Sequence, residues 1–306
     1  MRDPMELVRF EQDAHASELG ARTLIVALGG LIDAGNTQRL LVQHLLANGD
    51  PVVVASFDID QLLDYRGRRP LMTFQRDRFT SYEDPSLNLY RLTDDEGTPY
   101  LLLAGPEPDY QWERVSEAVR VLTRRLGVQL VISAHGIPMA VPHTRPVGMT
   151  KYATDPRLIP DNDAVFGEVQ IPGSLEQLVH LRLGESGVDA IGLALHVPHY
   201  LAAMDFGDAT VAAIDTIVGF TGLSLPVTDL AMQAELHRAE ISRQIEANPE
   251  IRDVVQGIEQ QYDAFAQGRQ RQNLLATELA ELPSAEEIGA EFEEFLRTEV
   301  GDDDED

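Results

Sequence analysis

Short, fully apolar runs alternate with helical stripes along most of this chain, and few folds accommodate such a pattern. The run Thr23 to Leu28 ends at Gly29-Gly30, and a helical stripe with Leu41 and Leu45 separates it from the run Pro51 to Ser56. A segment that is apolar at every position is typical of a strand buried on both faces, as in a parallel sheet covered by helices. The alternation therefore predicts an α/β fold.

Further strands are expected around an amphipathic helix in the middle of the chain. Asp109 is placed to cap this helix, whose apolar stripe runs from Val115 to Leu126. Ser174 and Gln177 form a capping box at the start of another helix. The expected strands are Leu87 to Leu92, Tyr100 to Ala104, Val128 to Ala134, Arg145 to Tyr152 and Val188 to Leu195.

The last third of the chain contains only helical patterns. A helix is predicted from Pro226 to Ala247, and Asn248-Pro249 supplies an N-cap followed by a proline for a second helix. This pair either covers the sheet of its own chain or contacts another molecule. We expect an α/β core domain over residues 1–225, a helical hairpin over 226–270, and a linker, a short amphipathic helix and a disordered acidic tail over 271–306.

The charge balance limits the partners of this protein. Its 306 residues include 24 Lys and Arg against 51 Asp and Glu, which gives a formal net charge of −27. Such a field repels nucleic acids and anionic membranes, so neither is an expected partner. The sequence has no cysteine, which excludes disulfides, cysteine-ligated zinc and thiol catalysis. No apolar run reaches the length of about 18 residues that spans a bilayer, and no secretory signal is expected, so the predicted location is cytoplasmic.

A turn with several glycines follows the first strand and resembles a phosphate-binding loop only in outline. In the segment Gly30 to Thr37, Asn36 occupies the position of the essential lysine, and Asp33 would bring negative charge toward a phosphate. The G-x-G-x-x-G spacing of dinucleotide sites is also missing, although Asp58 ends the second strand as a ribose-binding acid would. Asp33 is interpreted either as a helix N-cap or as a polar group that faces a cleft.

Arginines are concentrated in the segment Asp58 to Pro70, which is otherwise predicted to be irregular. Arg66, Arg68 and Arg69 lie within four residues in a strongly acidic chain. Guanidinium groups bind carboxylate or phosphate through two parallel hydrogen bonds, so this segment is a candidate anion clamp. Internal pairing with the neighbouring aspartates is the alternative.

Histidines follow two of the predicted strands at their carboxyl ends, where ligands bind in open α/β sheets. His135 and His143 flank the loop after the first of these strands, with Arg145 beside His143, and His196 and His199 follow the second. Each could serve as a general acid or base, or could be a hydrogen-bonded structural residue. His196 and His199 point to different sides of an extended chain, and we predict neither a metal site nor a cofactor.

Five segments form a combination that is specific although each segment alone is weak. The segments are Gly29 to Gly35, Phe57 to Asp60 with Asp64 to Pro70, Gly105 to Trp112, Gly136 to Pro146 and His196 to Tyr200. Together they resemble the proteasome assembly chaperone family, in the branch typical of actinobacteria, over roughly residues 20–225.

The resemblance implies a three-layer α/β/α sandwich similar to nucleoside phosphorylases and hydrolases, with a C-terminal helical extension. It also implies a protein–protein role rather than a defined reaction. Family members that dock on the proteasome carry a hydrophobic-Tyr-X ending, whereas this chain ends in Asp304-Glu305-Asp306. Docking on the proteasome through the C-terminus is therefore not expected.

No complete catalytic constellation is present in the sequence, and the G-x-S-x-G nucleophile elbow is missing. The leading expectation is a non-enzymatic protein-interaction or assembly-chaperone-like factor with an unknown protein partner. It is expected to form a homo-oligomer, with a trimer as the first form to test. The alternative is a binding protein or enzyme for a nucleoside- or phosphate-type small molecule. Arg66, Arg68 and Arg69 would then hold an anion, and His135, His143 or His196 would transfer protons.

Overall fold

Four parallel strands with apolar runs form the centre of the molecule. The computed structural model describes residues 2–11, 19–30, 32–160, 162 and 167–267. Six of the seven residues of β2 are buried, because helices cover both faces of the strand. The prediction of a strand buried on both faces in a parallel sheet is confirmed for the run at Thr23 to Leu28. The run at Pro51 to Ser56 forms a partly buried strand that is antiparallel to both of its neighbours. The four parallel strands lie in the order β7 (Pro99–Pro106), β2 (Thr23–Gly29), β8 (Leu130–Met139) and β10 (Asp189–Pro198).

Antiparallel strands extend the sheet at both edges. β6 and β7 form the predicted strand pair, and at their turn the Asp94 carboxylate accepts hydrogen bonds from the amides of Glu96 (3.0 Å) and Thr98 (2.7 Å). Beyond β7 lie β6 (Asn88–Thr93), β3 (Val52–Phe57) and β1 (Val8–Phe10), and β9 (Met149–Ala153) pairs with β10 at the other edge.

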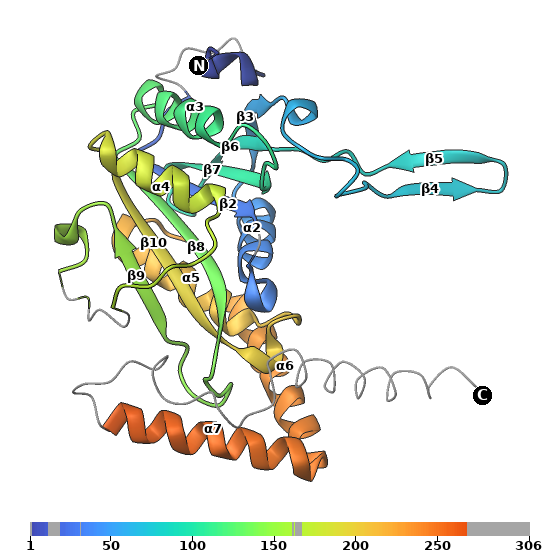
Figure 1. Ribbon diagram of the computed structural model, residues 1–306, viewed down its shortest axis with the longest axis vertical. Coiled ribbons are helices and arrows are strands. Elements are labelled where there is room, and N and C mark those ends of the chain that lie inside the picture. Colours follow the sequence, from blue (N-terminus) through green and yellow to red (C-terminus); the bar gives the residue numbers. More distant parts are fainter. Residues whose placement is uncertain (1, 12–18, 31, 161, 163–166, 268–306) are drawn as a thin grey trace.

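Helices on both faces of the sheet complete three layers (Figure 1). α2 (Thr37–Asn48) and α5 (Gly207–Thr221) cover one face, and α3 (Trp112–Arg125) and α4 (Leu175–Glu185) cover the other. Each face has its own apolar core: Leu41 and Ile214 belong to the first, and Val119 and Val179 belong to the second. The three-layer α/β/α sandwich is therefore confirmed.

The starts of two helices test the capping predictions. At α4 the capping box is present, since the Ser174 and Gln177 side chains accept hydrogen bonds from each other's backbone amides. At α3 the prediction is wrong: the helix begins at Trp112, and the Asp109 carboxylate binds the backbone amide of Asp64 instead (2.7 Å). The apolar stripe locates this helix but not its first residue. The loop before the helix is held against residues 62–64 by hydrogen bonds, which keep Asp109 away from the helix start. Short 3-10 turns are η1 (Pro4–Leu7), η2 (Ala34–Asn36), η3 (Ile59–Gln61), η4 (Pro156–Leu158) and η5 (His199–Leu201).

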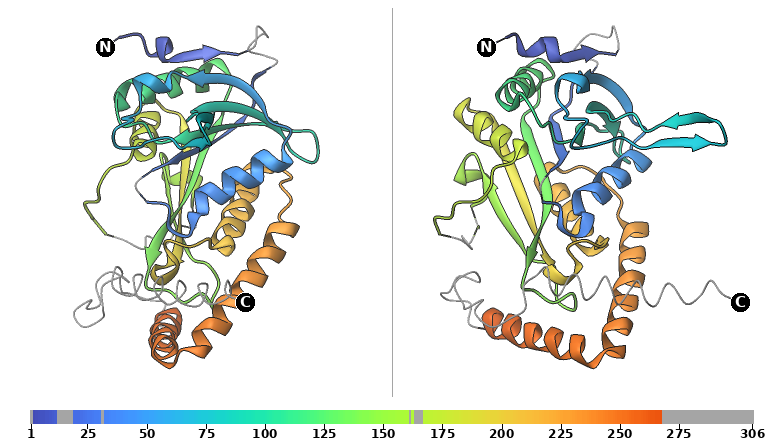
Figure 2. Two further views of the ribbon diagram at one scale, coloured as in Figure 1. Left: turned by 90° about the vertical axis from the view of Figure 1, so that its right-hand side faces the viewer. Right: turned by 45° about the vertical axis from the view of Figure 1, so that its right-hand side comes forward.

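The C-terminal helices α6 (Thr228–Ala247) and α7 (Pro249–Gln267) pack on the α5 side of the body (Figure 2). Ile241 of α6 and Ile258 of α7 are buried in the same apolar core as α2 and α5. Asn248 caps α7 as predicted, because its side-chain oxygen accepts a hydrogen bond from a first-turn amide (3.1 Å). Among the described helices, none is both long enough and apolar enough to cross a membrane. The linker, short helix and acidic tail expected over 271–306 lie outside the described residues.

A two-stranded hairpin projects from the body (Figures 1 and 2). It consists of β4 (Met72–Gln75) and β5 (Arg78–Tyr82), and every residue of both strands is exposed. A hydrogen bond from the Glu83 amide to the Leu71 carbonyl oxygen (2.9 Å) closes its base. The sequence patterns did not predict this element.

Candidate functional site

A cavity of about 500 Å³ lies where α4 begins, over the carboxyl-terminal halves of β2 and β8. The Ser174 cap fixes the first turn of α4 at this edge of the sheet, and Glu176 in that turn faces His135 of β8. Thr150 and Tyr152 of β9 line another part of the wall. The apolar part of the lining includes Leu28, Ile32, Ile137, Met139, Ile171 and Pro172.

Glu176 connects the polar groups that line this cavity. Its Oε2 accepts hydrogen bonds from Nε2 of Gln38 (2.8 Å) and, more weakly, from the Leu28 amide (3.4 Å). Its Oε1 lies 3.5 Å from Nδ1 of His135. Both side chains are largely buried, so this carboxylate and imidazole are shielded from bulk water.

A second carboxylate, that of Glu107, lies at the same end of α4. Glu107 follows β7 and is buried, and its Oε1 accepts a hydrogen bond from the Leu175 amide (2.6 Å). Burial raises the pKa of Glu107, although the hydrogen bond from Leu175 and the charge of Arg68 oppose this. The N-terminus of α4 therefore faces two carboxylates, which is the favourable arrangement for the helix dipole.

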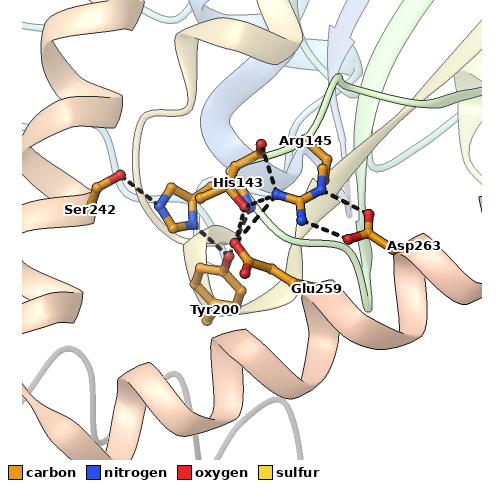
Figure 3. Close-up of polar contacts among 7 residues, drawn as sticks. His143, Arg145, Tyr200, Ser242, Glu259 and Asp263 are labelled. Carbon is orange, nitrogen blue, oxygen red and sulfur yellow. Dashed lines mark hydrogen bonds and ion pairs between the residues drawn. The ribbon is translucent and has the colours of Figure 1, made fainter.

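His143 lies in the loop after β8 and connects this loop to α6 (Figure 3). Its backbone amide and Nδ1 both meet the Tyr200 hydroxyl (2.9 and 2.8 Å), and Nε2 meets Oγ of Ser242 (3.1 Å). The Tyr200 oxygen accepts from the amide, so we infer that its hydrogen is donated to Nδ1 and that Nε2 donates to Ser242. Ser242 in turn donates to the Arg238 carbonyl oxygen (2.9 Å). These contacts fit a neutral imidazole, and burial lowers the pKa of His143 accordingly.

Arg145 fastens the same loop to α7 (Figure 3). Its Nε and Nη2 donate to the two carboxylate oxygens of Asp263 (2.9 and 2.7 Å), and Nη1 lies 3.6 Å from Glu259. Such bidentate pairs fix geometry as well as charge. The hydrogen bond from Arg145 holds the pKa of Asp263 below its ordinary value. The loop that carries His143 and Arg145 is therefore the attachment point of the C-terminal helices.

His196 and His199 form hydrogen bonds to groups of the protein. Nε2 of the buried His196 meets Oγ1 of Thr150 on β9 (2.8 Å), and burial lowers the pKa of His196 to about 4. Nδ1 of His199 donates to the Met139 carbonyl oxygen (3.4 Å), and burial lowers the pKa of His199 as well. Within the described ranges, no group of three His, Asp or Glu side chains could hold a metal ion.

The two candidate aspartates stabilise turns. The N-cap residue of α2 is Asn36, and Asp33 precedes the short turn η2. From there the Asp33 carboxylate accepts hydrogen bonds from the first-turn amides of Gln38 (2.8 Å) and Arg39 (3.1 Å), so it stabilises the start of α2 without being its N-cap residue. Asp58 accepts a hydrogen bond from the Gln61 side chain at the surface (2.6 Å). β6 and β7 separate β3 from β2, so Asp58 ends a strand about 14 Å from the turn where a ribose-binding acid would be needed.

Of the three candidate arginines, Arg68 is the one held by internal contacts in the described part of the chain. Its Nη1 donates to the Glu107 carbonyl oxygen (2.8 Å), and its Nη2 lies 3.0 Å from Asp109. Arg66 and Arg69 are exposed. Internal pairing with an aspartate therefore holds for Arg68, although the partner is Asp109 from another loop.

The sequence of the chain matches a known protein family. A family model described as the PAC2 family matches residues 27–245. This chain belongs to the PAC2 family. The resemblance to proteasome assembly chaperones, in the actinobacterial branch, is thereby confirmed.

Solved PAC2-like structures share most of the chain. A Mycobacterium tuberculosis protein of unknown function is 45% identical, covers 85% of this chain and 92% of its own, and superposes with a TM-score of 0.80. A Corynebacterium glutamicum protein of unknown function is 34% identical over 87% of this chain and 99% of its own, with a TM-score of 0.80. A M. tuberculosis proteasome-assembly chaperone homologue, 22% identical over 76% of this chain and 99% of its own, shares the fold with a TM-score of 0.68. No curated protein matches the chain.

In this PAC2 protein the predicted site residues do not gather in one place. His135 lines the cavity at α4, whereas His143 and Arg145 line a different one between α5 and α6. The sequence interpretation missed Glu176, the carboxylate beside His135, and Glu107, which binds the same first turn of α4. The capping box could have indicated Glu176, because it places this residue in the first turn of a helix at the carboxyl edge of the sheet.

Proposed function

We propose that this PAC2 protein is a non-enzymatic interaction factor of the assembly-chaperone kind, which works in the cytoplasm as a homo-oligomer. Membership of the PAC2 family and the fold shared with a proteasome-assembly chaperone homologue support this. The roles of the candidate residues also support it, since His143, Arg145 and His196 bind other parts of the protein.

The β4–β5 hairpin is the observation that carries the proposal. It exposes Leu71, Phe74 and Phe79, whose exposed fractions are 68%, 60% and 64%. The two phenylalanine rings meet edge to face with centroids 5.1 Å apart. An isolated two-stranded hairpin is marginally stable in water, and apolar side chains gathered away from the core mark an interaction surface. The hairpin therefore has the properties of an element that another protein covers.

Charge favours a second copy of this chain as the protein that covers the hairpin. Between Arg66 and Tyr82 there are five arginines and one aspartate, a local charge of +4 (5 − 1), whereas the whole chain carries −27. Three of these arginines precede the hairpin and Arg68 pairs with Asp109, so residues 71–82 themselves carry +1 (2 − 1). A locally basic segment is attracted to the body of the same acidic protein. We take a trimer as the first assembly to test.

Sedimentation equilibrium tests the self-association. The wild-type protein should sediment as a homo-oligomer, and the double variant Phe74→Ser/Phe79→Ser should weaken its assembly by at least about tenfold, because burial of each ring contributes about 1.5–3 kcal/mol. Leu181→Ser/Leu236→Ser is the matched control, since both side chains are exposed on other elements. A monomeric wild-type protein would contradict the proposed homo-oligomer.

Cross-linking in a lysate of the source organism tests the interaction role. A protein partner whose recovery falls in the Phe74→Ser/Phe79→Ser variant and persists in the control would support it. Assays of the pure protein with nucleosides and phosphate provide the opposing test. Turnover that Arg68→Ala abolishes would contradict a non-enzymatic role.

A further inference from the structure

The cavity at the start of α4 has the dimensions of a small-molecule site. Its volume of about 500 Å³ falls within the range of roughly 300–1,000 Å³ that is usual for ligand pockets. Such pockets combine apolar walls with a few convergent polar groups. Here Ile137, Met139 and Ile171 are in the walls, and Glu176, Thr150 and Tyr152 supply polar groups.

Glu176 has an oxygen with spare capacity to accept hydrogen bonds. Its Oε2 already binds Gln38 and the Leu28 amide, whereas among the described residues Oε1 meets only the more distant His135 nitrogen, at 3.5 Å. A carboxylate has about four acceptor positions, so Oε1 can take a donor from a ligand. A buried carboxylate is costly unless it is paired, so such a donor would be bound strongly.

Tyr152 adds a buried hydroxyl to the same wall. It lies near Ser133 and Glu176, and in the described part of the chain no partner meets it with good hydrogen-bond geometry. The Tyr152 ring packs directly against Gly192 of β10. A Cβ at that position would lie 2.0 Å from the ring, so the absence of a side chain at Gly192 makes room for it. Buried polar groups without partners are rare in folded proteins, so this hydroxyl indicates that a bound molecule or water supplies the partner.

The charges beside the cavity exclude an anion. The lining residues in the described part of the chain include the Glu176 carboxylate and no lysine or arginine. The amides of Leu175 and Gln177 at the helix N-terminus, which could attract a phosphate, are already bound to Glu107 and Ser174. A phosphate or carboxylate ligand would therefore meet negative charge without compensation, and a cation would meet an acceptor.

We propose that this cavity binds a small organic amine, with the protonated nitrogen at Oε1 of Glu176 and the apolar body against Ile137, Met139 and Ile171. The Tyr152 hydroxyl completes the polar end of the site. This site would bind a cation, whereas the arginine segment considered from the sequence would bind an anion. It adds a small-molecule site to a protein whose proposed role lies in protein interactions.

Calorimetric and thermal-shift titrations test the site with a panel of butylamine, hexylamine, cyclohexylamine and 2-phenylethylamine. The matched probes are 2-phenylethanol, phenylacetate and inorganic phosphate. At least one amine should bind saturably and raise the melting temperature. It should bind about tenfold more tightly than the alcohol of the same body, because a hydrogen bond between two charged groups is stronger than one between neutral groups. Phenylacetate and phosphate should not bind.

Two variants locate the binding. Glu176→Gln should remove the preference for the amine over the alcohol. Val169→Trp should abolish binding of both, because Val169 lines the cavity and is exposed, so a larger side chain fills the mouth without disturbing the core. Leu181→Trp, at an exposed site on α4, is the control and should bind as wild type does. Three results would overturn the proposal: no detectable binding of any amine, binding of phenylacetate or phosphate that is tighter than that of the amines, or unchanged amine binding in Val169→Trp.

Discussion

Tyr200 and Ser242 bind the two imidazole nitrogens of His143, so this one side chain joins the turn after β10 to helix α6. The Tyr200 hydroxyl has a double role, because it also accepts a hydrogen bond from the His143 amide. Its loss would leave two buried nitrogens without a partner. An unsatisfied buried group costs about 1–3 kcal/mol, which is large beside a typical net stability.

Tyr200→Phe should therefore lower the free energy of unfolding by about 1–3 kcal/mol in urea denaturation. Tyr65→Phe is the matched control, because the Tyr65 hydroxyl donates to Asp60 at the surface (2.7 Å) and its loss should cost about 0.5 kcal/mol or less. Equal losses for the two variants would contradict the network inferred around His143.

His196 should make stability depend on pH. Its ordinary pKa is 6.5, and burial lowers the pKa in the folded protein to about 4. Between these values the unfolded chain binds a proton that the folded chain does not, so stability falls as pH falls through this window. From pH 7.0 to 5.5 the wild-type protein should lose about 1 kcal/mol more than His196→Gln, as measured by urea denaturation. A loss of the same size in both proteins would show that His196 is not the group responsible.

The sequence could predict individual side chains of the cavity better than their partners. His135 was recognised because it follows a buried apolar run, which is a local pattern. Its partner Glu176 lies in α4, which follows the edge strand β9 in the chain, and this contact depends on the packing of α4 over β2 and β10 on either side of β8. Asp109 shows the same limit, since its pairing with Arg68 joins two loops and displaces it from the capping role.

At the scale of elements, the loop after β8 acts as the anchor of α6 and α7. Arg145 reaches α7 through Asp263, and His143 reaches α6 through Ser242. The sequence marked this loop as a candidate active site because of its position at a strand end. Its polar side chains instead bind polar side chains of the two docked helices.

Asp263→Asn should loosen α7 without unfolding the body. The pair with Arg145 is partly exposed, so its loss should lower the stability of the whole protein only slightly and speed hydrogen exchange of the α7 amides about two- to fivefold. Arg252→Gln is the control, because Arg252 pairs with Asp253 on the same helix and not with the body. Faster exchange in the β8 amides as well would contradict a local role of the anchor.

Elements with a buried face were predictable, and the exposed hairpin was not. Apolar runs and helical stripes record which side chains the core covers, so the central strands and the helices could be located. The residues of β4 and β5 are exposed on both faces, so their sequence carries no burial pattern. The turn gives no signal either, because Arg76 takes the left-handed conformation (φ 60°) where glycine or asparagine is usual.

At the scale of the whole molecule, the hairpin and the C-terminal helices differ in how the fold depends on them. The hairpin contributes nothing to either apolar core, and its base is closed between Leu71 and Glu83. The helices contribute Ile241, Ile245 and Ile258, which are buried against the rest of the body.

Two deletions should separate these roles. Replacement of residues 71–82 by a short Gly-Ser turn should leave the monomer folded, with a free energy of unfolding within about 0.5 kcal/mol of wild type at concentrations that disfavour assembly. Deletion from residue 226 onward should abolish cooperative unfolding. Burial of each large aliphatic side chain contributes about 1.5–3 kcal/mol, so the loss of several of them is comparable to a typical net stability of about 5–15 kcal/mol. Near-ultraviolet circular dichroism during urea denaturation distinguishes the outcomes. A cooperative transition in the shorter chain would show that residues 1–225 fold by themselves, and that α6 and α7 are an addition to the fold rather than part of it.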